Sequence, residues 1–165
     1  MLFRSRLCSG LSGIRPSEVD TIVIAGMGGE TILSILKAAP WTADGHHTLL
    51  LQPQTHEELV RQYLAENGFI ITREALVRDR GTLYTVMEAR AGKAKLTLTQ
   101  IWGGVCLLQD PLADRYIIEK IVRTQAALAG AKRSARPADA ERAEELRAVL
   151  TALLRAREEW RHANC

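Results

Sequence analysis

The feature that most constrains the fold is an apolar run that ends in a cluster of glycines and continues as an amphipathic segment. Thr21 to Ala25 contains no charged residue, Gly26, Gly28 and Gly29 follow it, and Thr31 to Leu36 has helical spacing. A short apolar strand, a glycine turn and a helix together form half of a βαβ unit. Because no polar residue alternates along the apolar run, it predicts a strand buried on both faces. The glycines would then lie at the carboxyl end of that strand, where open α/β sheets bind ligands.

The glycine turn is compatible with a purely structural role and with three kinds of ligand site. A dinucleotide fingerprint fits poorly, because Thr31 occupies the final small position and the next predicted strand, Thr48 to Leu51, ends in Gln52 instead of an acid. A phosphate-binding P-loop is excluded because the sequence contains no Gly-Lys-Ser or Gly-Lys-Thr. The remaining interpretation is a later strand end of a methyltransferase-like sheet, where the turn borders the reacting groups.

The pattern after the second strand predicts a helix and then a pair of strands. Thr55 and Glu58 have the spacing of a capping box for a helix over Glu57 to Glu66. The strands are expected over Phe69 to Val77 and Thr82 to Ala89, and the four residues between them favour an antiparallel hairpin. A parallel sheet that finishes with an antiparallel hairpin strand is the methyltransferase arrangement.

The last third of the chain is predicted to be helical. Apolar residues recur at helical spacing from Asp110 to about Ala129 and from Asp139 to about His162. Gly130 to Ala138 is a short basic turn between them, so the two helices should fold back as an antiparallel hairpin. The segment from Asp114 onward carries 11 basic and 8 acidic residues of a chain whose net charge is +3. That excess would suit contact with RNA phosphates, although such charges are usually just solvated helix faces.

Four motifs in this order resemble the TrmK family of tRNA (adenine-N1)-methyltransferases. They are Asp20 to Gly29 (DTIVIAGMGG), Leu49 to Gln54 (LLLQPQ), Glu66 to Phe69 (ENGF) and Gly81 to Ala89 (GTLYTVMEA). The resemblance covers roughly Arg6 to Ala89. It implies an α/β fold with a Rossmann-like methyltransferase sheet over residues 1–95, and a helical carboxyl-terminal domain over residues 96–165. It also implies S-adenosylmethionine as cofactor and adenine 22 of tRNA as substrate.

The resemblance further assigns candidate site residues. The catalytic positions would be Gly26, Met27, Gly28, Gln52 and Pro53. The cofactor would be held by Ala25, Gly26, Gly28, Gly29 and Gly10. The RNA would be contacted by Lys132, Arg133 and Arg136. This chain departs from the family pattern at Ser9, where the family has an acid, and at Gln54, where it has asparagine. The family also has an acid and an aromatic where Glu74 and Tyr84 stand, but we expect a surface charge and a half-buried strand tyrosine at these positions and not catalytic residues.

Composition excludes several other classes of protein. A chain that is 47% hydrophobic and 25% charged is typical of an ordinary soluble globular protein, with no apolar run long enough to span a membrane. Its three cysteines are far apart and form no CxxC pair, so we expect reduced thiols in the cytoplasm and no metal site. His46 and His47 are expected to be solvated loop residues and not metal ligands.

Only 19 residues precede Asp20, so the strand, glycine turn and acid that open a methyltransferase sheet are not in this sequence. The strand at Ile22 to Ala25 would then have a bare edge, which is an aggregation and swapping hazard. Either the chain is a fragment of a longer enzyme, the interpretation we favour, or a second copy covers the edge in a homodimer. We therefore expect weak binding of S-adenosylmethionine. The alternative function is a non-catalytic oligomerisation or RNA-interaction module derived from a methyltransferase.

Overall fold

The structure, a computed structural model, describes residues 4–134 and 136–164 and forms two compact units. The first contains the chain up to Arg73 together with Tyr84–Lys95. The second contains Glu74–Leu83 and the chain from Leu96 onward. The tip of the predicted strand pair thus belongs to the helical unit. The simple division into domains at residue 95 stays a prediction.

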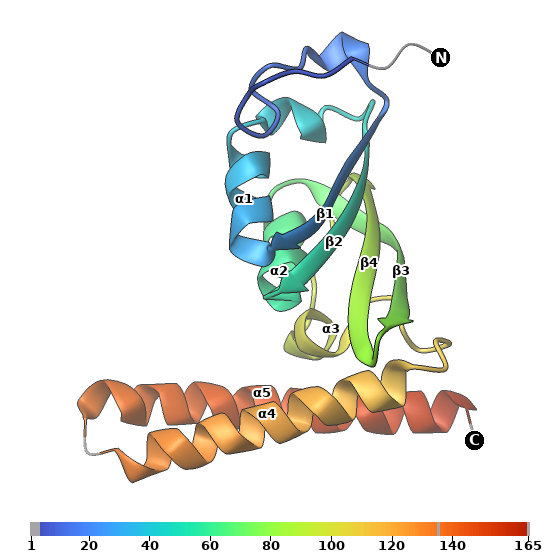
Figure 1. The fold of residues 1–165 in the computed structure, drawn as a ribbon. Coiled ribbons are helices and arrows are strands. Elements are labelled where there is room, and N and C mark those ends of the chain that lie inside the picture. Colours follow the sequence, from blue (N-terminus) through green and yellow to red (C-terminus); the bar gives the residue numbers. More distant parts are fainter. Residues whose placement is uncertain (1–3, 135, 165) are drawn as a thin grey trace. The chain divides into compact units, whose positions relative to one another are not determined.

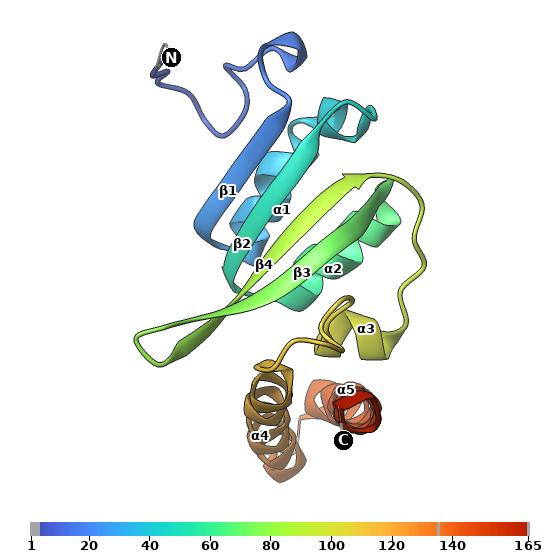
Figure 2. The same cartoon turned by 90° about the vertical axis from the view of Figure 1, so that its right-hand side faces the viewer.

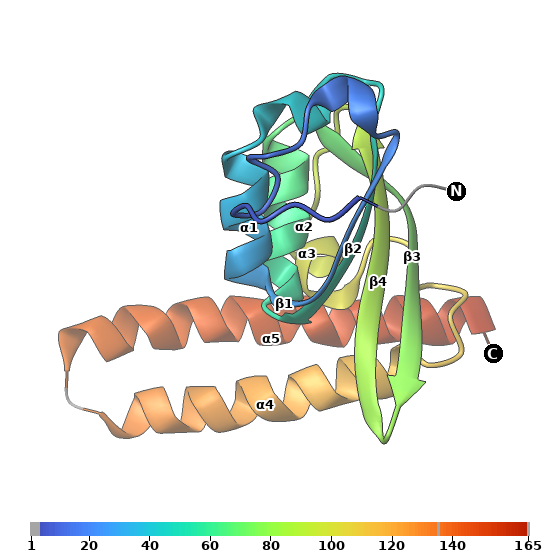
Figure 3. The ribbon, with the colours of Figure 1, turned by 45° about the horizontal axis from the view of Figure 1, so that its top comes forward.

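The first unit is built on a sheet whose strands run in the order β1-β2-β4-β3. β1 (Thr21–Gly28) pairs in parallel with β2 (Thr48–Thr55), and β2 pairs antiparallel with β4 (Thr82–Ala91). β3 (Phe69–Asp79) continues into β4 through the expected hairpin (Figure 3). The predicted α/β class is confirmed, including the antiparallel hairpin strand. Within the described residues β1 is an edge strand of this sheet.

Two helices, α1 (Gly29–Lys37) and α2 (Glu57–Glu66), cover one face of the sheet (Figures 1 and 2). Ile22 and Ile24 point toward these helices and are 5% exposed each, whereas Val23 between them is 66% exposed. The expectation that this strand is buried on both faces was therefore wrong. An uninterrupted apolar run shows that both faces tolerate burial, but it cannot show whether an element packs on each of them.

The apolar core of this unit consists mainly of aliphatic side chains, and the polar side chains of Arg61 and Thr42 are buried as well. The largest buried apolar members are Ile32, Leu36, Leu49, Leu51, Val60, Leu64, Phe69 and Met87. Burying each such side chain stabilises the fold by about 1.5–3 kcal/mol relative to exposure. Ile32 and Leu36 lie in the segment for which the sequence predicted helical spacing, and both are buried in α1.

One helix start differs from the predicted pattern. α2 spans Glu57–Glu66 as expected, but its N-cap is His56, without a side-chain capping bond, so the capping box of Thr55 and Glu58 does not form. Thr55 instead belongs to β2, where it pairs with Gly28. The strand continues four residues further than predicted, and this removes Thr55 from the helix start.

In the second unit, α4 (Ala113–Arg133) and α5 (Pro137–Asn164) lie side by side in opposite directions (Figures 1 and 3). The predicted antiparallel helical hairpin is confirmed. A short helix that the sequence did not predict, α3 (Leu98–Gly103), packs so closely on α5 that a Cβ on Gly103 would lie 2.5 Å from that of Ala156.

The hairpin tip is tied to this helical unit by its acidic and backbone groups. Glu74 is 8% exposed and accepts a 2.6 Å hydrogen bond from the Val105 N–H. The Leu76 N–H donates to Asp110 at 2.8 Å. The expectation of a surface charge at Glu74 was wrong, because its carboxylate pairs with a loop that is distant in sequence and therefore invisible to local patterns.

Candidate functional site at the carboxyl ends of two parallel strands

The ends of β1 and β2 form one rim, as the sequence predicted. Ala25 lies opposite Gln52, Met27 opposite Pro53 and Gly28 opposite Thr55. The register shifts between Ala25 and Met27, so Gly26 is the extra residue of a β-bulge. Its φ of +75° is a conformation that glycine adopts without steric cost.

The bulge is held by a side chain from the neighbouring strand. The Gly26 N–H donates to Gln52 Oε1 at 2.8 Å, and Gln52 Nε2 donates to the Pro53 carbonyl at 3.3 Å. The side chain of Gln52 therefore supplies the acceptor for the Gly26 N–H. The bond ties the two strand ends together, and one lone pair of Oε1 is already engaged in it.

The rim is open, not covered by other side chains. Ala25 and Gly26 are exposed and Met27 is 41% exposed, while Gly28 and Gln52 are partly buried. Pro53 and Gly29 are buried beneath this surface. A ligand at the rim would thus meet backbone groups from β1 and little side-chain bulk. The side chain of Gln54, which stands where the family has asparagine, also reaches this rim next to Gly26, 3.9 Å from an ideal Cβ there.

The loop after β2 closes tightly on the start of α1. A Cβ on Gly29 would lie 2.6 Å from the His56 carbonyl oxygen and 2.8 Å from that of Thr55. His56 itself has φ +56°, a left-handed conformation that costs a non-glycine residue about 1–2 kcal/mol. Its side chain is 54% exposed, and Nδ1 lies 3.1 Å from Glu58 Oε1. Sequence reasoning missed His56, because no local pattern marks a histidine that takes a left-handed turn.

The predicted cofactor residue Gly10 lies in the amino-terminal segment, apart from the glycines of β1. It has φ +53°, and a Cβ there would lie 3.1 Å from the Ile35 side chain on α1. It lines a surface hollow of about 780 Å³ together with Leu11, Ile14 and Val19 among others. None of Ala25 to Gly29 lines this hollow, so the predicted cofactor set falls into two groups.

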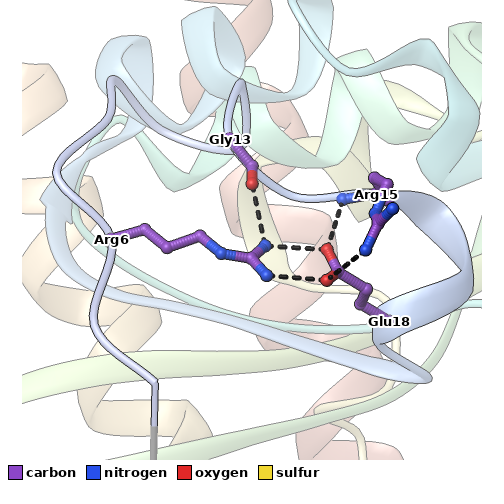
Figure 4. A network of polar contacts seen from close by, with 4 residues as sticks. All are labelled: Arg6, Gly13, Arg15 and Glu18. Atoms are coloured by element: carbon purple, nitrogen blue, oxygen red, sulfur yellow. Dashed lines mark hydrogen bonds and ion pairs between the residues drawn. The ribbon is translucent and has the colours of Figure 1, made fainter.

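An ion-pair network holds the wall of this hollow (Figure 4). Arg6 donates to both carboxylate oxygens of Glu18, at 2.7 and 2.6 Å, and to the Gly13 carbonyl at 2.8 Å. Glu18 also accepts from the backbone N–H of Arg15 at 2.9 Å. The bonds from Arg6 and then Arg15 lower the pKa of Glu18 far below its ordinary value. The carboxylate therefore stays ionised, and it fixes the path of the chain into β1.

His47 also holds the segment before β1, through the Pro16 carbonyl. The residue is buried at 3% exposure, so the expectation that His47 is a solvated loop residue was wrong. Its Nδ1 lies 2.8 Å from Asp44 Oδ1 and its Nε2 lies 3.1 Å from the Pro16 carbonyl oxygen. Burial lowers the pKa of His47, but the Pro16 carbonyl and Asp44 outweigh it, and the net pKa is raised. Both ring nitrogens face acceptors, so the protonated imidazolium fits this position best.

The predicted RNA-binding residues lie in the second unit at the joint of the helical hairpin. Lys132 and Arg133 belong to the last turn of α4 and not to a turn, because the helix continues to Arg133. Arg136 lies just before α5 and forms a 3.2 Å ion pair with Asp139. All three side chains are exposed. Each can therefore reach a phosphate without rearrangement of the core.

No group of histidine, cysteine and acidic residues within the described parts of the chain has the geometry of a metal site. The described helices also include none with both the length and the apolar character that a membrane crossing needs.

A model of the methyltransferase domain matches residues 2–87, which is half of the chain and includes both strand ends of the rim. The chain belongs to this methyltransferase domain family. The methyltransferase domain expected from the glycine and Gln-Pro motifs is thereby confirmed. The domain is 37% identical over 83 residues to the tRNA (adenine(22)-N(1))-methyltransferase of Bacillus subtilis, a match that covers 50% of this chain and 35% of that protein. The chain thus matches about a third of the length of this curated relative.

The likeness to solved structures extends over most of this chain. A Streptococcus agalactiae protein of the NADB-Rossmann superfamily matches with a TM-score of 0.77 and 26% identity, covering 92% of this chain and 66% of that one. The Streptococcus pneumoniae protein Sp1610, a putative tRNA (m1A22) methyltransferase in complex with S-adenosyl-L-methionine, matches with a TM-score of 0.75 and 26% identity, covering 92% and 67%. The predicted Rossmann-like fold is confirmed.

Proposed function

We propose that this methyltransferase domain takes part in methyl transfer from S-adenosylmethionine to N1 of an adenine in tRNA, adenine 22 in the case of the relatives it resembles. The observation that carries the proposal is the open rim at which the Gly26 N–H and Gln52 Oε1 hold two parallel strand ends together. Open α/β sheets bind their ligands at such carboxyl ends. The family membership and the names of the similar proteins point to the same chemistry.

The rim suits a reaction that depends on alignment more than on acid or base chemistry. When bound, the cofactor supplies an electrophilic methyl group, and the adenine N1 supplies a lone pair. Holding two reactants in a near-attack geometry can supply about 7–11 kcal/mol of the barrier. The exposed backbone of Ala25 and Gly26 can face the adenine edge without side-chain obstruction. The base must leave its stack to reach the rim, as in other enzymes that modify bases.

The residues present fit the cofactor at two places. The hollow beside Gly10 and Leu11 has the volume for a nucleoside, and the glycines of β1 leave room for the methionine end and the reacting methyl group. Gly26 and Gly28 are candidates for the second place, with Ala25 beside them, whereas Gly29 would act by letting the Thr55–His56 backbone close on the start of α1. Ser9 cannot supply the carboxylate that the family places near the adenine ring of S-adenosylmethionine, so any hydrogen bond to that ring would come from other groups.

The tRNA would be held by charge at the helical hairpin. Lys132, Arg133 and Arg136 are exposed, and they lie where two long helices meet. Phosphate neutralisation supplies most sequence-independent affinity for nucleic acid. This assignment, the cytoplasmic location and the catalytic roles of Gly26, Met27, Gly28, Gln52 and Pro53 belong to the same proposal.

A second candidate function is a non-catalytic oligomerisation module. It is favoured by the edge position of β1 and by the exposed Val23 on the uncovered face of the sheet. A second copy of the chain that pairs along β1 would cover this edge in a homodimer.

Calorimetric titration with S-adenosylhomocysteine separates the two functions. The methyltransferase proposal expects saturable binding, together with 1-methyladenosine in a tRNA transcript incubated with the chain and S-adenosylmethionine. Binding should disappear in Gly28→Val, whose branched side chain would fill the rim, while the circular dichroism spectrum stays unchanged. Absence of binding, combined with a dimer in sedimentation analysis, would support the module instead.

A further inference from the structure

His56 is the histidine nearest to the rim along the chain, and none of the roles described above uses it. It directly follows Thr55, which pairs with Gly28, and its carbonyl oxygen would lie 2.6 Å from a Cβ on Gly29. The backbone of this residue thus adjoins the start of α1, directly after the β1 residues at which the methyl donor and the adenine are proposed to meet. Its left-handed φ of +56° is one of two such values among the described non-glycine residues.

The imidazole ring of His56 is oriented by a neighbouring carboxylate. Glu58 lies two residues later in the first turn of α2, and its side chain is only 12% exposed. Its Oε1 lies 3.1 Å from His56 Nδ1. A carboxylate accepts hydrogen bonds and donates none, so the hydrogen of a neutral ring sits on Nδ1. The lone pair is then on Nε2, at the end of the ring away from Glu58.

We propose that His56 Nε2 accepts a hydrogen bond from the exocyclic amine of the target adenine and thereby selects adenine over 6-oxopurines. Glu58 acts as the positioning residue that keeps the lone pair on Nε2. This inference rests on the proposed function, since it assigns a residue to the base that the rim would hold. An adenine presents an N–H donor at this position, whereas a 6-oxopurine presents a carbonyl oxygen, which would meet the Nε2 lone pair without a hydrogen between them.

The same contact would assist the reaction. As N1 gains its methyl group the ring becomes positively charged, and the exocyclic amine becomes a stronger donor. The hydrogen bond from this amine to His56 Nε2 would therefore be stronger in the transition state than in the ground state, which is the condition for catalysis. Gln52 Oε1 already accepts a hydrogen bond from the Gly26 N–H. His56 Nε2 would be a second acceptor near the rim, available to the exocyclic amine.

The test uses two nucleotides that differ in this one group and needs no methyl donor. Adenosine 5′-monophosphate and inosine 5′-monophosphate are titrated into the ¹⁵N-labelled chain in mildly alkaline buffer, and the imidazole nitrogen and backbone amide resonances are followed. We expect the adenine nucleotide to shift His56 Nε2 together with the Gly26 and Gly28 amides. We expect the inosine nucleotide to bind about 3- to 10-fold more weakly, the range of one hydrogen bond.

The matched variant is His56→Asn, because asparagine tolerates the left-handed backbone and lacks the imidazole. It should keep the amide spectrum of α2 and lose the preference for adenine. Three outcomes would overturn the inference: equal binding of the two nucleotides, adenine shifts at Gly26 and Gly28 without one at His56 Nε2, or no shift at the rim at all. Failure of the proposed function is seen separately, as the absence of S-adenosylhomocysteine binding and of 1-methyladenosine.

Discussion

The close approach of the β2–α2 loop to α1 makes Gly29 the most sensitive position of the rim. In Gly29→Ala the new Cβ would lie 2.6 Å and 2.8 Å from two backbone carbonyl oxygens, those of His56 and Thr55. Real Cβ atoms do not approach so closely, and backbone cannot rotate away as a side chain can. Overpacking of this kind costs about 1–3 kcal/mol. The better helix propensity of alanine returns at most about 1 kcal/mol, so we expect net destabilisation of about 1–2 kcal/mol.

Urea unfolding of the chain followed by circular dichroism measures this change, with Gly130→Ala as the matched control. Gly130 is also a helical glycine, in α4, but an added Cβ there would meet no atom within 4 Å. The control should therefore be stabilised by about 0.5–1 kcal/mol through helix propensity alone. The reasoning is refuted if Gly29→Ala is as stable as the natural chain or gains as much as the control. A second consequence is that the loop would move from the rim, so binding of S-adenosylhomocysteine should weaken.

Three further predictions follow from the contacts described above. Folding raises the pKa of His47, so the protonated ring stabilises the fold at pH values below the ordinary histidine pKa near 6.5, and this stabilisation is lost as the pH rises through the higher pKa of the folded state. In urea unfolding measured across that pH range, His47→Gln should make the free energy of unfolding less dependent on pH. An unchanged pH dependence in the variant would contradict this prediction. Gln52→Leu removes the acceptor of the Gly26 N–H and should cost about 0.5–1.5 kcal/mol and abolish cofactor binding, whereas Gln62→Leu on the exposed face of α2 should do neither. Replacing both Lys132 and Arg133 with alanine should weaken tRNA binding in a filter-binding assay and make the negative slope of log affinity against log salt concentration shallower by about 2. An unchanged slope would exclude these residues as phosphate contacts.

The parts of the structure that depend on local pattern were predictable from the sequence. Gly26 lies at the bulge with positive φ, and Gly29, the first residue of α1, lies at the tight contact with the loop after β2, so the glycine cluster marked the rim directly. The predicted bounds of α2, Glu57 and Glu66, are those of the structure, although the capping box from which its start was predicted does not form. The meeting of Ala25 with Gln52 followed from the rule that parallel strands end at one edge. Whether these residues hold the ligands assigned to them stays a prediction.

The parts that depend on distant partners were not predictable. His47 is buried because the Pro16 carbonyl, 31 residues away in sequence, meets its Nε2. Glu74 is buried because the backbone of Val105 donates to it, again across 31 residues. Val23 is exposed because no described element packs on that face of the sheet. The left-handed turn at His56 was not predicted because the spacing of Thr55 and Glu58 favoured Thr55 as the N-cap, and the close approach to Gly29 is a tertiary contact.

The most direct test of the central claim is to map the amide shifts of the ¹⁵N-labelled chain on addition of S-adenosylhomocysteine. We predict that the largest changes fall on Gly26 and Gly28, on the side-chain amide of Gln52, and on Gly10 in the hollow beside α1. Changes confined to the helices α3 to α5, or no changes at concentrations that saturate related enzymes, would contradict the claim that the joined ends of β1 and β2 form the methyl-transfer site.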